Sequence, residues 1–433
     1  MTYLSKSLSK DASKYSLFTW SEQLCDERIV ITRAKGSYFW DDKDKKYLDF
    51  VSQQVNLNLG HSHSKLTTSI VKQIKSLGYI SPYFISKPKV ELAKELVKLT
   101  GLGKVLFTTG GGEANENAII IARQFSGKDV VLSRDPSYHG ATCAARTASR
   151  DKTRNLPGKY DAPFFEYFSA PNCSKGNYKD HNQCCAASLN ELKKQINKFN
   201  GNIAAIIIEP IPGAQGVLIP SKDYLTDLVS ICRKNNILVI FDEVMTGFGR
   251  TGKWFSYQHW GVFPDIVTFS KGINGGAVPL GAVVISKKIA RYFNHHKLLS
   301  GLTNSGHPLS CASAIEAIKI YKEEKLVQKA KKNGLLLKQL GDRFTKRYPQ
   351  VSDFRSIGLF AALEFNNSGL ISTTEEFVNQ IYQETCSLGV YIQARLNCIL
   401  IAPPLIIQPE EIRVGLITID KAIKKCLEKY SKS

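Results

Sequence analysis

Two short segments of this 433-residue chain carry side chains that could act on an amine or a carbonyl. Lys271 follows the apolar run 266–269, and the carboxylates Asp242 and Glu243 follow the apolar run 237–241. A lysine held partly out of water has a depressed pKa and can attack a carbonyl to form an imine. A carboxylate buried at a strand end needs a cationic partner. Either segment alone is also typical of a surface lysine, a structural ion pair or a magnesium ligand, so each needs the context of the other.

A third segment has the composition of a phosphate-binding turn. Three successive glycines, 110–112, follow the apolar run 105–107, and residues 113–123 favour a helix. Glycines in front of a helix allow backbone amides to approach an anion and aim the helix N-terminus at it. The same pattern also occurs in an ordinary tight turn. The three segments together predict a site that combines an amine nucleophile, a buried carboxylate and an anion-binding loop.

The elements that must position these residues alternate between short apolar runs and helical stretches. Such alternation predicts a mostly parallel sheet with crossover helices. Ligands of these sheets bind outside the carboxyl ends of the strands, where residues 137–140 and Glu209 are also expected. The predicted strands span residues 105–107, 130–132, 203–208, 237–241 and 266–269.

Both ends of the chain are predicted to form a smaller α+β domain. Residues 36–50 alternate like a β-hairpin, and the segments 308–324 and 326–348 have the pattern of long amphipathic helices. We therefore expect an α/β fold with three sequence regions. These are an N-terminal part of the small domain at 1–70, a large α/β domain at 71–310, and the rest of the small domain at 311–433.

Composition limits the classes of function. The formal charge of +20 could indicate nucleic acid, but the lysines are spread in short groups without interleaved aromatics, so a solvated surface is the preferred interpretation. The chain has no apolar run long enough for a membrane span and no signal-peptide pattern near its start, which predicts a cytoplasmic protein without a membrane or nucleic-acid partner.

Cysteine and histidine patterns predict no metal site. The ten cysteines include no Cys-x-x-Cys pair and no zinc spacing, so we expect reduced thiols. Redox pairing of the adjacent Cys184 and Cys185 is disfavoured, because sequence neighbours are poorly placed to bridge. His61 and His139 each neighbour a glycine, and structural roles are favoured over catalytic ones.

The motifs, taken in order, resemble the class III (ω-amino-acid) aminotransferases, which depend on pyridoxal 5′-phosphate. The resemblance covers nearly the whole chain. It rests on Gly110-Gly111-Gly112-Glu113-Ala114-Asn115-Glu116, Tyr138-His139-Gly140, Glu209-Pro210, Asp242-Glu243-Val244 with the following Met245 to Arg250, Lys271, Thr303-Asn304-Ser305-Gly306-His307-Pro308 and Ala402-Pro403-Pro404-Leu405.

The resemblance implies a fold-type I transferase, with a central, mostly parallel seven-stranded sheet, helices on both of its faces and a smaller α+β domain. It also implies a homodimer with shared active sites, or a tetramer of such dimers. Lys271 is then the Schiff-base lysine, Asp242 the partner of the pyridine nitrogen, and Glu209 a residue near the cofactor hydroxyl. Gly112 stands where many relatives carry Ser, Thr or Ala, which removes a hydroxyl but keeps the amides.

The remaining cofactor contacts are also implied by the resemblance. Val244 and Tyr138 are expected to pack on opposite faces of the cofactor ring, with His139 beside them. The amides of Gly111 and Gly112 are expected to hold the phosphate, aided by Thr303 of the other subunit.

Substrate-binding residues are harder to predict. Arg395 could clamp a carboxylate or sulfonate, the alternative being a surface arginine. Trp20 and Tyr83 could form pocket walls, the alternative being ordinary core aromatics. The expected reaction is a ping-pong transamination from an ω-amino acid or related amine, of the taurine, β-alanine or 4-aminobutyrate type, to pyruvate or 2-oxoglutarate. An aminomutase or decarboxylase on the same fold, and a non-catalytic cofactor-binding protein, remain as alternatives.

Overall fold

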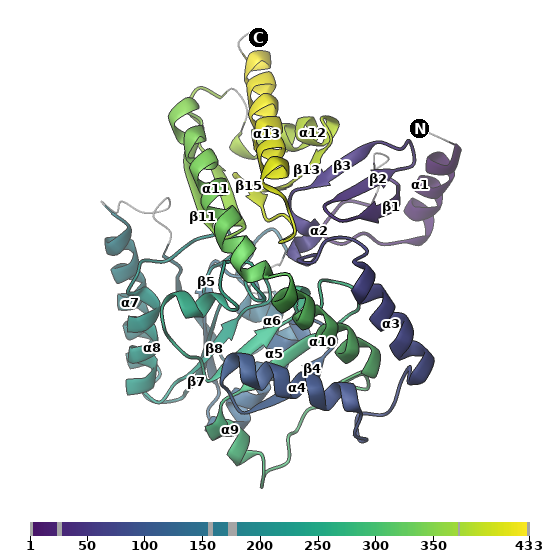
Figure 1. Ribbon diagram of the computed structural model, residues 1–433. Coiled ribbons are helices and arrows are strands. Elements are labelled where there is room, and N and C mark those ends of the chain that lie inside the picture. The colour runs from purple at the N-terminus through teal and green to yellow at the C-terminus, as the bar shows by residue number, and fades with distance from the viewer. Residues whose placement is uncertain (1–2, 24–27, 155–158, 172–179, 371–372, 431–433) are drawn as a thin grey trace.

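The structure is a computed structural model that describes residues 3–23, 28–154, 159–171, 180–370 and 373–430. Its architecture has three sheets, one of seven strands and two of four strands. Figure 1 shows the large sheet with its helices in the lower part of the molecule and the two small sheets above it, where α1 (Tyr3–Tyr15) and α13 (Pro409–Tyr430) also lie.

The seven-stranded sheet has the strand order β4-β10-β9-β8-β7-β5-β6. Strand β10 runs antiparallel to both neighbours, whereas the pairings from β9 to β6 are all parallel. The predicted mostly parallel sheet is therefore confirmed, although β6 and β10 were not predicted. The strands are β4 (Lys104–Thr108), β5 (Val130–Asp135), β6 (Phe165–Ser169), β7 (Ile203–Ile208), β8 (Leu238–Asp242), β9 (Ile266–Phe269) and β10 (Gly281–Ile285).

The inner strands are mostly apolar because both faces of the sheet are covered by helices. All six residues of β7 are buried, and residues 205–208 alternate between two hydrophobic clusters. Ala205 and Ile207 pack with helix α5, whereas Ile206 and Ile208 pack in the cluster that holds the helices of the opposite face. Continuous apolar strands are typical of parallel sheets buried on both sides. The helices of this region are α3 (Ser64–Ser76), α4 (Lys87–Thr100), α5 (Gly111–Ser126), α6 (Cys143–Ala148), α7 (His181–Lys198), α8 (Tyr224–Lys234) and α9 (Lys287–Tyr292).

One small sheet joins the two ends of the chain. Its order is β1-β2-β3-β13, and the C-terminal strand β13 pairs in parallel with β3 through Val390 opposite Leu48. The predicted hairpin is confirmed as β2 and β3, with β1 added at its edge. The bounds are β1 (Ile31–Lys35), β2 (Tyr38–Asp41), β3 (Lys46–Asp49), the short α2 (Ser52–Val55) and β13 (Val390–Tyr391).

The second small sheet is antiparallel, with the order β11-β12-β15-β14. The two predicted long helices are confirmed, and Lys325 separates them in a left-handed conformation with φ 53°. The division of the chain at residues 70 and 310 stays a prediction. The elements are α10 (Pro308–Glu323), α11 (Leu326–Arg347), β11 (Val351–Ile357), β12 (Phe360–Phe365), α12 (Thr374–Ser387), β14 (Gln393–Arg395) and β15 (Cys398–Ile401).

Within the described ranges, no helix is long and apolar enough to cross a membrane. No disulfide joins any of the eight described cysteines, and both Cys184 and Cys185 are buried in α7. Cys25 and Cys173 lie outside the described residues.

Candidate active site

The strand ends of the large sheet open on a cavity of about 510 Å³. Its lining brings together residues from the N-terminal segment, the loops after β4, β5, β7, β8 and β9, and strand β14 of the small sheet. Most predicted site residues line it: Trp20, Gly111, Gly112, Tyr138, His139, Glu209, Asp242, Val244, Lys271 and Arg395. A single cavity therefore collects side chains that lie up to 380 positions apart, from Trp20 to Leu400.

Lys271 supplies the amine of the cavity. It lies two residues after the end of β9 and begins a short 3-10 helix, η3 (Lys271–Ile273), with a left-handed φ of 45° that non-glycine residues rarely adopt. Burial, followed by the positive charge of Arg154, lowers the pKa of its amine to about 8, against the opposing effect of Asp242. A lysine with a pKa near neutrality has a useful fraction of free amine, as nucleophilic and general-base chemistry requires.

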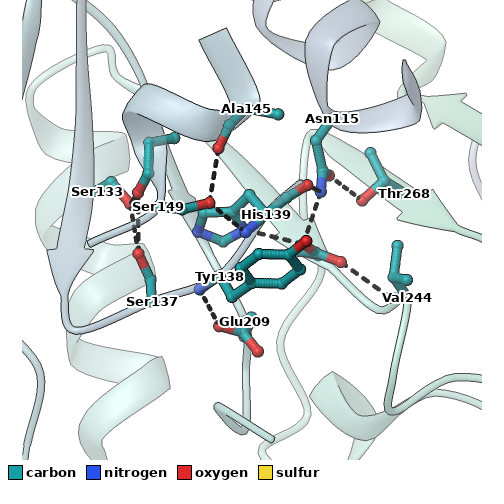
Figure 2. Close-up of polar contacts among 12 residues, drawn as sticks. Asn115, Ser133, Ser137, Tyr138, His139, Ala145, Ser149, Glu209, Val244 and Thr268 are labelled. Atoms are coloured by element: carbon teal, nitrogen blue, oxygen red, sulfur yellow. Dashed lines mark hydrogen bonds and ion pairs between the residues drawn. The ribbon is translucent and has the colours of Figure 1, made fainter. Parts of the chain in front are cut away.

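Asp242 ends β8 with its carboxylate almost fully buried, at 4% exposure. Its Oδ2 accepts hydrogen bonds from Asn115 Nδ2 at 2.7 Å and from His139 Nδ1 at 2.8 Å, and its Oδ1 accepts one from the Val244 amide at 2.9 Å. Asn115 is oriented in turn by Thr268, whose hydroxyl donates to Asn115 Oδ1 at 2.6 Å. Figure 2 shows this network. Several donors on one carboxylate fix its position.

Glu209 follows β7 and is the second buried carboxyl group of the cavity. Its Oε1 accepts a hydrogen bond from the Tyr138 amide at 3.0 Å, as Figure 2 shows, and its Oε2 accepts one from the Gly213 amide at 3.3 Å. Burial raises the pKa of Glu209, which the nearby His139 partly offsets. Two carboxyl groups of one cavity thus differ in environment, because Asp242 receives three hydrogen bonds from its partners and Glu209 receives two.

The glycine-rich loop forms an open helix N-terminus. Helix α5 begins at Gly111, two residues earlier than predicted, and no side chain caps it. A Cβ atom on Gly111 would lie 2.9 Å from Val244 Cγ1, and one on Gly112 would lie 3.5 Å from Gly140 Cα. The backbone at Gly111 therefore packs directly on Val244, and no side chain stands between the first amides of α5 and the cavity. Uncapped first-turn amides are donors for an anion such as phosphate.

Aromatic rings form one wall. Tyr138 and Trp20 meet edge to face, with ring centroids 6.4 Å apart. The guanidinium of Arg154 lies 4.5 Å from the Tyr138 ring centroid and 4.7 Å from that of Trp20. Trp20 is therefore a wall of the cavity rather than a core aromatic.

Arg395 lies in the cavity lining with most of its donors engaged. Its Nε donates to the Ala214 carbonyl at 2.6 Å, and its Nη2 donates to Asp151 Oδ2 and, at 3.2 Å, to Thr153 Oγ1. It is not the free surface arginine of the alternative interpretation. In this conformation its hydrogen bonds are made to the protein, so a substrate anion must compete with Asp151 for it.

Two predicted residues do not line the cavity of a single chain. The Tyr83 side chain is 95% exposed, and Thr303 is exposed, with its carbonyl accepting a hydrogen bond from the Tyr79 hydroxyl at 3.0 Å. Their contribution to a site stays a prediction that requires a second chain. His61 lies away from the cavity, where its Nε2 is 2.9 Å from Asp49 Oδ2, so its structural role is supported.

Sequence reasoning did not single out four residues that shape the site. Arg154 and Gln54 line the cavity, Asn115 holds Asp242, and Arg250 is a fully buried guanidinium that donates to Asn58 Oδ1 at 2.7 Å and to the Pro403 carbonyl. Asn115 and Arg250 belong to the sequence motifs that carry the family resemblance, and this was the signal in the sequence that could have indicated a role in the site. Arg154 and Gln54 follow no strand, and no local pattern indicates them.

The residues present fit pyridoxal 5′-phosphate. The open N-terminus of α5 suits a phosphate, the buried carboxylate of Asp242 suits a protonated pyridine nitrogen, and the amine of Lys271 suits an aldehyde. Among the described residues, no group of three or more His, Cys, Asp or Glu side chains could hold a metal ion.

Comparison with known proteins gives a consistent result. The profile of the family described as "Aminotransferase class-III" matches residues 21–423. A putrescine–pyruvate aminotransferase of Pseudomonas aeruginosa is 32% identical over 95% of this chain and 93% of its own, and a probable γ-aminobutyrate transaminase of Oryza sativa is 31% identical over 98% and 92%. The solved taurine:2-oxoglutarate aminotransferase of Bifidobacterium kashiwanohense, in complex with pyridoxal phosphate and glutamate, is 36% identical with a TM-score of 0.93, over 98% of both chains. The chain thus belongs to the class III aminotransferases, enzymes of the fold-type I architecture that depend on pyridoxal 5′-phosphate.

Proposed function

We propose that this aminotransferase moves the amino group of an ω-amino acid or related amine to a 2-oxo acid by a ping-pong mechanism. The relatives support this class of donor, since their names include putrescine, γ-aminobutyrate and taurine. The acceptors that these names print are pyruvate and 2-oxoglutarate. The choice among them for this chain is part of the proposal.

The observation that carries the proposal is the presence of Lys271 and two guanidiniums in one cavity. Lys271 and Asp242 supply the site of amine chemistry, and Arg154 and Arg395 supply cations able to bind an anion. A substrate that places an amine at Lys271 and a carboxylate or sulfonate near the arginines suits this arrangement. An ω-amino acid has both groups, separated by a short carbon chain.

The residues divide the chemistry between them. Pyridoxal phosphate supplies a carbonyl that condenses with primary amines and a ring that accepts electron density. Lys271 would hold the cofactor through this carbonyl and, as a free amine with a lowered pKa, would carry the proton of the site. Asp242 would pair with the ring nitrogen, and its three hydrogen bonds keep its carboxylate in place. Glu209, Tyr138 and Val244 enclose the same space.

The proposal includes a homodimer whose partner completes each site. Four large apolar side chains near the predicted contact residues Tyr83 and Thr303 in sequence are strongly exposed: Tyr83 itself at 95%, Phe84 at 62%, Ile85 at 89% and Leu299 at 71%. Such exposure in a monomer is typical of an interface. Sedimentation equilibrium tests this part, and a purely monomeric holoenzyme would contradict it.

The test of the function is the absorption spectrum of the purified holoenzyme before and after addition of taurine, β-alanine or 4-aminobutyrate. We expect the visible band of the enzyme-bound cofactor to be replaced by a near-ultraviolet band with at least one donor, and pyruvate or 2-oxoglutarate to restore the visible band. The Lys271→Ala variant should show neither change. A visible band that no amine removes would favour an aminomutase or a binding role. Absence of any cofactor band would refute the proposal.

A further inference from the structure

A buried carboxylate outside the catalytic group faces both arginines of the cavity. The side chain of Asp151 is 2% exposed, and it does not itself line the cavity. Its Oδ1 accepts hydrogen bonds from the Thr153 amide at 3.0 Å and the Thr153 hydroxyl at 2.7 Å, which hold the carboxylate in a tight turn. Its Oδ2 is left to face the guanidiniums of Arg395 and Arg154.

Arg395 and Arg154 differ in how closely they approach Asp151 Oδ2. Arg395 hydrogen bonds to Asp151 Oδ2, whereas Arg154 Nε lies 3.9 Å from the same atom, beyond hydrogen-bond distance. In the described part of the chain, the Arg154 guanidinium makes no hydrogen bond, and its position is set by the rings of Trp20 and Tyr138. Arg154 therefore keeps donors available to a ligand, whereas Arg395 has its Nε and Nη2 engaged and, within the described residues, only Nη1 makes no hydrogen bond.

Charge counting shows what Asp151 does to this end of the cavity. Two guanidiniums share one carboxylate, so their combined charge is reduced from two to one. The two charges also oppose each other, because burial and then the positive charge of Arg154 lower the pKa of Arg395. Without Asp151, two like charges would face each other and the cavity.

We propose that Asp151 is an internal counter-ion of the substrate's anion subsite, which occupies Arg395, leaves Arg154 as the primary anion ligand, and so weakens the binding of substrate carboxylates and sulfonates. The inference rests on the proposed function for the identity of the substrate, but not for the presence of the subsite. A substrate anion binds Arg154 first and gains Nη2 of Arg395 only in competition with Asp151. Asp151 is thus a specificity-determining, positioning residue that limits the preference for anionic over uncharged substrates.

The variant Asp151→Asn tests this inference, because an amide retains an oxygen for Thr153 but removes the charge. The probes are butyrate and its uncharged analogue butyramide, which lack an amine and cannot react. Their dissociation constants from the holoenzyme are measured by calorimetry. We expect the variant to bind butyrate about tenfold more tightly, the low end of what close charge pairs contribute, with butyramide unchanged. The KM for 4-aminobutyrate should fall while kcat stays within about twofold.

A matched control is Glu364→Gln, which also removes a buried carboxylate from an arginine. Glu364 pairs with Arg355 and is 9% exposed, but neither residue lines the cavity. This variant should leave butyrate and butyramide binding unchanged. A second variant, Asp151→Ser, retains an acceptor for the turn and should tighten butyrate binding in the same direction if the asparagine protein does not fold.

The outcomes separate this inference from the proposed function. Unchanged or weaker butyrate binding in the Asp151 variants would overturn it, and so would absence of butyrate binding in every protein. Equal weakening of butyrate and butyramide would indicate a merely structural turn and would also overturn it. If no amine changes the cofactor spectrum but butyrate binding still tightens selectively, the proposed transamination fails and the anion subsite stands.

Discussion

Replacement of Lys271 by methionine should stabilise the cofactor-free protein at neutral pH. The lysine side chain is held where its charged form is unfavourable, since burial and Arg154 lower its pKa from 10.5 to about 8. At 1.36 kcal/mol for each pKa unit, this difference corresponds to a cost of about 3 kcal/mol for folding the protonated lysine. Lys271 keeps some exposed surface, so the cost is at most this value. Methionine has a similar length and no charge, so the variant should recover most of this cost.

The effect should depend on pH with a definite sign. Below about pH 8 the amine is protonated in both the folded and the unfolded chain, so the full cost is present. Between about pH 8 and 10.5 the folded chain releases this proton and the unfolded chain keeps it, so unfolding takes up a proton and stability rises with pH. By pH 10 the advantage of the variant should fall below about 1 kcal/mol.

The assay is guanidinium unfolding of both cofactor-free proteins at pH 7 and pH 10, followed by tryptophan fluorescence. Other groups that titrate over this range are common to both proteins, so only the difference in unfolding free energy is interpreted. Lys193→Met, on the exposed face of α7, controls for the change in side-chain type and should alter stability by less than about 0.5 kcal/mol. A Lys271→Met protein no more stable than the wild type at pH 7, or an advantage that persists at pH 10, would refute the reasoning.

Three further predictions concern the site and its support. Asp242→Asn should lower kcat by a factor of about 10² to 10³, the usual effect of losing one preorganised electrostatic contact. The urea unfolding of the holoenzyme should change little. A kcat within tenfold of the wild type would contradict this role. Gly111→Ala should weaken cofactor binding, because its Cβ would lie 2.9 Å from Val244 Cγ1, and fluorescence titration of the cofactor-free protein with pyridoxal phosphate measures the change. Gly341→Ala should destabilise the protein by about 1–3 kcal/mol in a denaturant titration, because its Cβ would lie 2.1 Å from the Phe354 ring. The cofactor spectrum of the Gly341→Ala variant should stay normal. An unchanged unfolding midpoint would show that the contact between Gly341 in α11 and Phe354 in β11 is not tightly packed.

Most of the large sheet could be predicted from the sequence, because its inner strands are buried on both faces and read as continuous apolar runs. Strands β7, β8 and β9 follow this rule and match their predicted bounds within one residue. Strand β6 lies at the sheet edge and mixes aromatic with polar residues, so it lacks the apolar run. Strand β10 begins with a glycine and was not predicted.

The local sequence by itself determined the residues that follow strands, namely the amine of Lys271, the carboxylate of Asp242 and the open glycine turn at the start of α5. A residue placed directly after a parallel strand reaches the ligand edge of the sheet whatever the loops do. Tertiary structure decided the rest. Only folding brings Asn115 to Asp242 across 127 positions, places Trp20 and Arg154 on Tyr138, and engages Arg395 with Asp151 across 244 positions. These contacts depend on how the loops pack and on which of several nearby acceptors binds each donor. Neither is encoded by a local pattern of residue types.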